Sequence, residues 1–110
     1  MIGLIVLQPF ADQIINKEKK IEYRSIRYPK KNMNVPVYLL SKGKVLGIVR
    51  FTDVNWFSEA KGVVYGHVIE VIKKFKTPLN YDHPNGAQTW IKDVKLKNDK
   101  MDQRSEKNRS

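Results

Sequence analysis

Two β-rich segments joined by a tight turn place the strongest constraint on how this sequence can fold. Residues 37–40 and 44–54 are rich in valine, leucine and isoleucine, and Ser41-Lys42-Gly43 lies between them. Gly43 suits a turn position with positive φ, so we predict a β-hairpin here. The second segment is apolar on both faces as far as Val49, as in a central strand. The chain is therefore predicted to be mainly β.

Other segments add further strands and a short helix. Residues 2–7, 20–24, 63–75 and 89–96 have strand patterns, with Trp90 as the packing residue of the last. Residues 9–16 are predicted to form a helix, because Pro9 suits a first turn and Phe10 and Ile14 have helical spacing. Residues 55–62 are predicted to be a connection that includes a helical turn. We therefore predict a small mixed β-barrel with one or two short helices, in the α+β or mostly β class.

The length of the chain suits one domain. It has 110 residues and is 41% hydrophobic, which is enough for one small core. We assign residues 1–96 to the domain and predict that residues 97–110 are a disordered basic tail, because they are polar and lack periodicity. The absence of cysteine excludes disulfides and thiolate catalysis. With no signal-peptide pattern at residues 1–7 and no long apolar run, we expect a cytoplasmic protein without a membrane partner.

The charge of the chain favours a polyanionic partner. Twenty-one Lys and Arg residues against 11 Asp and Glu give a net charge of +10, and most of this excess lies in residues 1–91. A basic compact domain most often binds nucleic acid, although the charge could instead serve only solubility. The predicted phosphate and base contacts are Arg27, Tyr28, Lys30, Lys31, Lys42, Lys44, Lys73, Lys74 and Lys76.

Three aromatic residues have two interpretations each. Tyr28 lies in a basic loop, where its ring could stack on a base or pack over the end of the barrel. Trp56 and Phe57 are adjacent in the predicted connection, and they could form a base-stacking surface or cover the core. For all three we favour packing against the protein.

A charged stretch at residues 17–25 is the candidate site. If residues 20–24 form a strand, Lys20, Glu22 and Arg24 point to one face, and Ile21 and Tyr23 to the other. That polar face could be solvated. Alternatively, it could be a pocket in which Glu22 orients Lys19 and Arg24 toward a ligand.

The residues around this stretch resemble a known family. Residues 8–11 read Q-P-F-A, and after seven residues comes K-x-x-E-x-R at Lys19, Glu22 and Arg24. With the segments at 47–54 and 86–90, this resembles the ASCH domain, a PUA-like family, over about residues 3–92. The glycine of the family falls on Lys17, which lacks the freedom of glycine at positive φ.

The resemblance implies a PUA-like barrel and RNA, more than DNA, as the partner. The ligand pocket would be formed by Lys19, Glu22, Arg24 and Ser25 and would receive a base or ribose. An enzyme is the alternative, because some ASCH-like proteins are amidohydrolases that act on acetylated cytidine and others are ribonucleases. In that case Lys19 and Glu22 would be catalytic, with Glu70 as the distant acid. The coactivator that gave the family its name adds a third class, a protein-interaction module.

The sequence predicts neither a metal nor a cofactor. His67 and His83 are the two histidines, and His67 has no cysteine or second histidine at metal-ligand spacing, so we expect no metal site there. Tyr65, on the same face of the predicted strand, is interpreted as structural. Walker and Rossmann glycine loops are absent. The pattern gives no prediction of oligomeric state.

Overall fold

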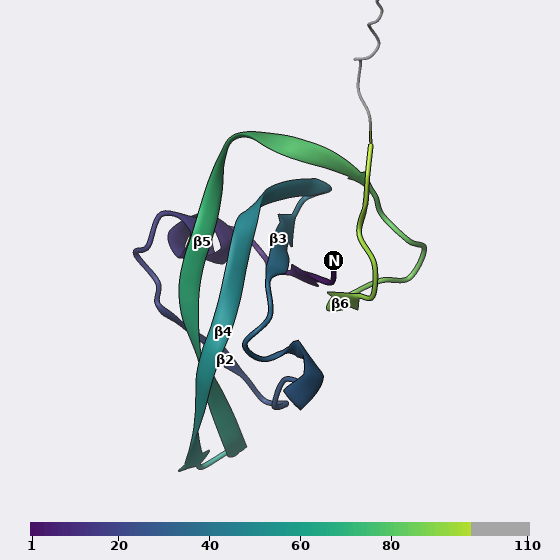
Figure 1. Ribbon diagram of the computed structural model, residues 1–110. Coiled ribbons are helices and arrows are strands. Elements are labelled where there is room, and N and C mark those ends of the chain that lie inside the picture. Colours follow the sequence, from purple (N-terminus) through teal and green to yellow (C-terminus); the bar gives the residue numbers. More distant parts are fainter. Residues whose placement is uncertain (98–110) are drawn as a thin grey trace, which may run out of the picture.

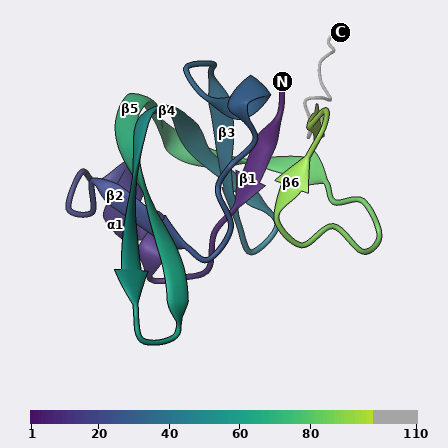
Figure 2. The same cartoon turned by 90° about the horizontal axis from the view of Figure 1, so that it is seen from below.

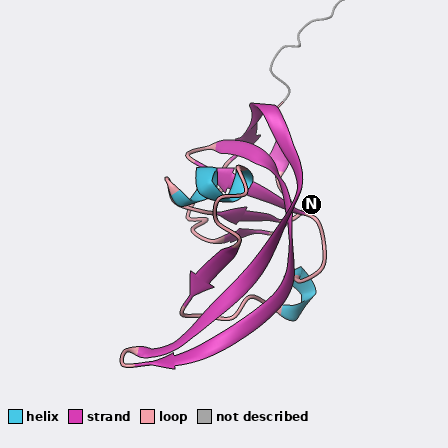
Figure 3. Cartoon of the chain, turned by 90° about the vertical axis from the view of Figure 1, so that its left-hand side faces the viewer, coloured by secondary structure: helices cyan, strands magenta, loops and turns pink. Residues whose placement is uncertain are grey.

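A pair of long antiparallel strands organises the molecule (Figure 1). The computed structural model describes residues 1–97. Within them, β4 spans Lys44–Glu59 and β5 spans Gly62–Asp82, and the two strands pair from Lys44↔Asn80 to Glu59↔Gly62. Their joined ends protrude from the rest of the domain as a curved ribbon (Figure 3). We call residues 55–66 of this ribbon the arm.

The shorter strands extend the sheet on both sides of this pair. The order is β2 (Ile21–Arg24), β5, β4, β3 (Val37–Ser41), β1 (Gly3–Ile5) and β6 (Trp90–Ile91), and β7 (Lys95–Leu96) pairs with β5. Only β1 and β3 are parallel within the described residues. The first and last strands, β2 and β6, do not pair with each other, so the sheet is not closed into a barrel.

The predicted closed barrel is therefore wrong, while the mostly β class with a short helix is confirmed. Strands of four and two residues are too short to close the gap, and residues 25–29 and 83–89, which lie beside them, form no strand. Figure 2 shows the open arrangement, with α1 beside β2 and β5 and the arm projecting away from β1 and β6.

The helix α1 (Phe10–Ile15) is held at both ends by local hydrogen bonds. At its start, the Gln8 side chain accepts a bond from the Asp12 backbone N–H and donates one to the Asp12 carboxylate, both 3.0 Å. At its end, the N–H groups of Lys17 and Glu18 donate to the carbonyls of Ile14 and Gln13, at 2.9 and 2.8 Å. This is a Schellman motif, with Lys17 at φ 65° in the position that usually holds glycine. The turn before the charged motif therefore forms without the glycine of the family.

The core lies between α1 and the sheet. Its larger cluster is formed by α1, β1, β3 and β4, and a smaller one lies under the end of β5, around Leu40, Val45 and Tyr81. Gly47 allows α1 to approach the sheet, because a Cβ there would lie 2.6 Å from Ile15 Cδ1 and 2.2 Å from the Lys73 carbonyl oxygen. A 3₁₀ turn, η1 (Lys30–Asn32), follows β2 and precedes β3.

The hairpin at Gly43 is confirmed, with Lys42 and Gly43 both at positive φ as a type I′ turn requires. The predicted connection over residues 55–62 is wrong, because these residues continue β4 and turn into β5. The predicted strand at 63–75 runs on to Asp82, and the one at 89–96 is divided into β6 and β7.

The first residue of the predicted tail is bonded to β5. The Lys97 N–H donates to the Asn80 carbonyl at 2.9 Å, so Lys97 adjoins the sheet. The rest of the predicted tail, residues 98–110, lies outside the described residues. In the described part of the chain, no helix has the length and apolar character to cross a membrane.

Candidate functional site

The polar face of β2 points into the protein and its aromatic residue points out. Glu22 is 6% exposed, Arg24 is half-buried, and Tyr23 is 50% exposed. This reverses the usual pattern, in which charged side chains face water. Glu22 therefore does not lie on a solvated face.

Glu22 is the centre of a small ionic network. Its Oε2 accepts a bond of 2.8 Å from Arg24 Nε, and its Oε1 lies 3.7 Å from Lys19 Nζ. Lys19 also lies over the rings of Phe10 and Tyr23, at 5.6 and 5.4 Å from their centroids. Lys19 is thus held between one carboxylate and two aromatic rings.

His67 on β5 is bonded to the backbone of Glu22, at the centre of this network. It is fully buried, and its Nδ1 donates to the Glu22 carbonyl at 3.2 Å while its Nε2 accepts from the Tyr28 backbone N–H at 3.0 Å. Burial lowers the pKa of His67, outweighing the opposite effect of the bond to Glu22. A neutral ring with both nitrogens engaged gives His67 a structural role.

Tyr28 packs in the core. Its ring is 4% exposed, stacks on His67 at 3.7 Å and meets Trp90 edge-on at 5.0 Å. Burial raises its pKa. The packing interpretation of Tyr28 is therefore confirmed. Tyr28 also borders one of the cavities described below, and its contact with a nucleic acid stays a prediction. The Tyr28 hydroxyl is buried without a hydrogen-bond partner among the described residues.

A cavity of about 320 Å³ lies beside Glu22 and Arg24. The end of β1 and the start of α1 form its apolar side, with Phe10 as the aromatic member, and Gln88 lines it from the loop before β6. Arg24 bonds to Glu22 through its Nε nitrogen alone. Its two terminal nitrogens make no hydrogen bond or ion pair with another described residue. The cavity thus combines a carboxylate, free guanidinium donors and an apolar wall.

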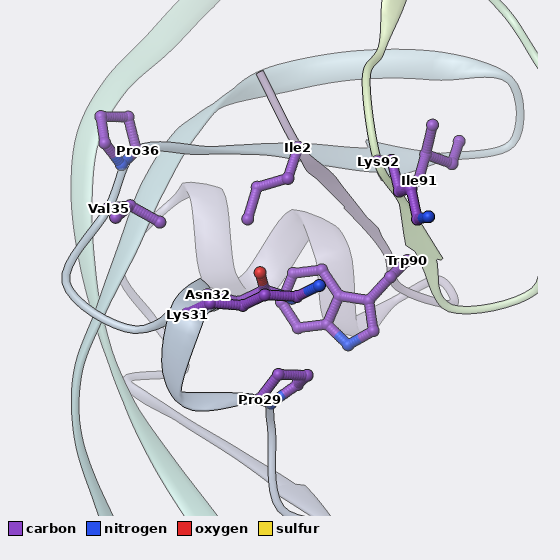
Figure 4. Close-up of a pocket in the computed structure, with 9 residues that line it drawn as sticks. All are labelled: Ile2, Pro29, Lys31, Asn32, Val35, Pro36, Trp90, Ile91 and Lys92. Carbon is purple, nitrogen blue, oxygen red and sulfur yellow. The ribbon is translucent and has the colours of Figure 1, made fainter.

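Two further cavities share lining residues with this one or with each other. The next, of about 440 Å³, shares Arg24 and is also lined by Ser25, Arg27 and Trp90. A third, of about 610 Å³, shares Trp90 with the second and extends to Lys31. In Figure 4 the Trp90 indole lies across the middle of this third cavity, toward η1. We call these three neighbouring cavities the groove.

The predicted basic residues form two separate groups. Arg27 and Lys31 line the groove, and Lys30 is beside them on η1. Lys42 and Lys44 lie at the other end of β3, in the turn that follows Ser41 and at the start of β4. Near that end, Lys73 and Lys74 lie opposite Ile48 and Gly47, followed in β5 by Lys76. The nine predicted contacts therefore do not form one continuous surface.

Glu70, the acid considered for an enzyme, belongs to another ion pair. Its Oε1 accepts a bond of 2.9 Å from Arg50 Nε, and both side chains are exposed. Glu70 and Lys19 do line a common cavity, separate from the groove, but no ion pair joins them. The geometry thus brings Lys19 and Glu22 together, while Glu70, which lines a separate cavity, is paired with Arg50.

Sequence reasoning missed Gln88 and Trp90 as site residues. Both come from the loop and strand more than 60 residues after the charged motif, and the β1–β6 pairing brings them to it. Trp90 was predicted only as a packing residue, because a single aromatic residue in a short strand does not indicate that it borders a cavity. The sequence signal that could have identified both residues is the G-x-x-x-W segment at residues 86–90, which is part of the resemblance to the ASCH domain.

Comparison with known proteins identifies the fold. No protein-family model and no curated protein matches the sequence. Among solved structures, the crystal structure of a mutant ZmASCH protein from Zymomonas mobilis matches with a TM-score of 0.60 at 12% identity, covering 72% of each chain. A structural match at 12% identity supports a shared fold and gives no information on a shared activity. The chain has an ASCH-like fold, as the resemblance of its motifs predicted.

Proposed function

We propose that this protein binds single nucleic-acid strands, with RNA preferred, and holds one base in the cavity of Glu22 and Arg24. The observation that carries the proposal is a buried carboxylate fixed to a guanidinium at the wall of that cavity. Nucleobase edges present donors and acceptors side by side. Glu22 can accept from a ring or exocyclic N–H, while the free nitrogens of Arg24 donate to a neighbouring oxygen or ring nitrogen.

The size of the cavity supports a ligand no larger than a nucleoside. Its volume of about 320 Å³ lies at the low end of the roughly 300–1,000 Å³ typical of ligand pockets. Phe10 and the neighbouring aliphatic residues give the apolar contact that a base needs on its faces.

The groove supports a chain of nucleotides beyond that one base. It leads from Arg24 past Arg27 to Lys31, so cations line the path that a phosphate backbone would follow. The net charge of +10 favours the same partner. The preference for RNA over DNA rests on the resemblance to ASCH and PUA-like domains.

Fluorescence anisotropy with a labelled single-stranded RNA tests the proposal. Arg24→Lys keeps the charge but loses the guanidinium fork, so its affinity should fall about tenfold, or 1.4 kcal/mol. Arg50→Lys is the matched control, because Arg50 makes a similar pair with Glu70 outside the groove. It should change affinity less than twofold. DNA of the same sequence reports the preference for ribose.

Salt dependence separates a phosphate contact from a small-molecule site. With about four phosphates neutralised, log Kd against log salt should have a slope near 3 in magnitude for a single strand. Folded wild-type protein that binds neither RNA nor DNA at low salt would refute the proposal. Equal effects of the two arginine substitutions would remove the cavity from it.

A further inference from the structure

The arm exposes apolar side chains to an unusual extent. Trp56 is 66% exposed, Phe57 47% and Val63 42%. Beside the arm, β2 ends at the Arg24↔Tyr65 pair, so the arm has no third strand beyond that point in the described chain. Exposed aromatic residues on a protruding ribbon are a feature of binding surfaces. The predicted packing of Trp56 and Phe57 over the core is therefore wrong.

The two aromatic residues of the arm point to opposite faces. Residues directly opposite each other in a sheet share a face, so Trp56, Tyr65 and Arg24 form one row across β4, β5 and β2. The next row on the same face contains Glu22 and His67. Phe57 lies on the other face, where its ring is 6.5 Å from that of Tyr23.

The face of Trp56 adjoins the proposed base cavity. Trp56 and Arg24 are two strand spacings apart in one row, which places their Cα atoms about 10 Å from each other. Arg24 lines both of the first two cavities of the groove. Unlike Phe57, Trp56 makes no ring contact with any described residue.

We propose that this face of the arm is a stacking platform for unpaired bases of RNA, with the Trp56 indole receiving a nucleotide near the one held by Glu22 and Arg24. The inference rests on the proposed function and narrows its ligand to single-stranded RNA. Stacking requires a free base face, which a duplex does not offer. Tyr65 and Val63 continue the apolar surface beside Trp56.

Charge favours RNA over a second copy of the protein as the occupant of this face. Arg24 lies in the same row as Trp56, and Arg27 follows just after β2, so the apolar surface is bordered by cations that suit phosphates. Two copies with a charge of +10 each repel one another. The few side chains of the arm also offer little area against the roughly 1,200–2,000 Å² of a stable protein interface.

Adjacent substitutions on the two faces test the inference. The probe is a fluorescein-labelled single-stranded RNA of about 12 nucleotides, long enough for the groove and the arm together. Trp56→Ala should raise Kd roughly five- to hundredfold, the range for loss of one base stack, and Trp56→Phe should recover part of the affinity. Phe57→Ala is the matched control, with less than a twofold effect expected. A duplex of the same sequence should bind more weakly and respond equally little to both alanine substitutions.

Three outcomes would overturn the inference. If Trp56→Ala and Phe57→Ala have equal effects while Arg24→Lys still weakens binding, the platform is absent and the base cavity stands. If folded wild-type protein binds no RNA, both proposals fail. If sedimentation shows a wild-type dimer that Trp56→Ala dissociates, the face is a protein interface instead. Thermal melting of each variant confirms that it is folded.

Discussion

Glu22→Gln should destabilise the domain far more than the same change at Glu70. Each glutamate accepts a bond from an arginine Nε, Glu22 from Arg24 at 2.8 Å and Glu70 from Arg50 at 2.9 Å. Glu70 accepts a second bond from Arg50 Nη2, and Glu22 also faces Lys19. The largest difference is burial, since the Glu22 side chain is 8% exposed and that of Glu70 is 51% exposed.

The expected cost at Glu22 follows from the network around it. A hydrogen bond to a charged partner contributes about 1.5–3 kcal/mol, and Gln retains a weaker, neutral acceptor. Arg24 and Lys19 keep side-chain exposures of 27% and 22%, so water compensates part of the loss. We expect Glu22→Gln to lower the free energy of unfolding by about 2 kcal/mol. An exposed pair contributes about 0–1 kcal/mol, so Glu70→Gln should cost less than about 0.5 kcal/mol.

Urea denaturation and thermal melting measure both variants. In a domain of this size, 1 kcal/mol shifts the melting temperature by roughly 4–8 °C. Glu22→Gln should therefore melt about 10 °C below the wild type, and Glu70→Gln within about 3 °C of it. Equal shifts, or a Glu22→Gln variant as stable as the wild type, would show that the buried network does not hold β2 in place.

Three further predictions concern the residues around this network. Lys17→Gly should raise the free energy of unfolding by about 0.5–1 kcal/mol in urea denaturation. It removes left-handed strain of about 1–2 kcal/mol from the folded state, and the greater conformational entropy of the unfolded chain offsets part of that gain. A lower free energy of unfolding would show that Lys17 makes a stabilising contact. Because burial lowers the pKa of His67, this side chain is protonated in the unfolded chain before it is protonated in the folded protein as the pH falls below about 6.5. The free energy of unfolding should therefore fall by up to about 1.4 kcal/mol per pH unit, down to the pKa of His67 in the folded protein. Thermal melting at a series of pH values should show this slope, and His67→Gln should flatten it. Tyr28→Phe should leave stability unchanged or raise it by about 1 kcal/mol, because it removes a buried hydroxyl without a described partner; a clear fall in melting temperature would contradict this.

Local sequence signals predicted the elements whose causes are local. The hairpin at Gly43 follows from turn chemistry between two β-rich segments, and α1 follows from Pro9 and the spacing of its apolar residues. The charged motif also identified Glu22 and Arg24, since the resemblance carries their spacing. These features need only a few neighbouring residues to specify them.

The arm and the groove could not be predicted in the same way. Trp56 and Phe57 are apolar residues that stay exposed, so the rule that buries such residues gave the wrong answer. The length of β5 was hidden by Pro78, which normally excludes a regular strand. Here Pro78 falls where residues 75–78 lie opposite Leu46 alone, an irregularity that spares the proline a ladder bond. The groove combines β2 with residues 88–92, whose proximity depends on the whole sheet.

The position of β1 has a consequence for how the protein folds during synthesis. β1 lies between β3 and β6, and the Val94 N–H donates to the Met1 carbonyl, so the first residues of the chain are bonded to some of the last described ones. The hairpin of β3 and β4 can form early, while β1 gains its second neighbour only after residue 91 has left the ribosome. Contacts this distant along the chain slow folding, so a nascent chain that stops short of β6 should leave one edge of β1 open to other strands.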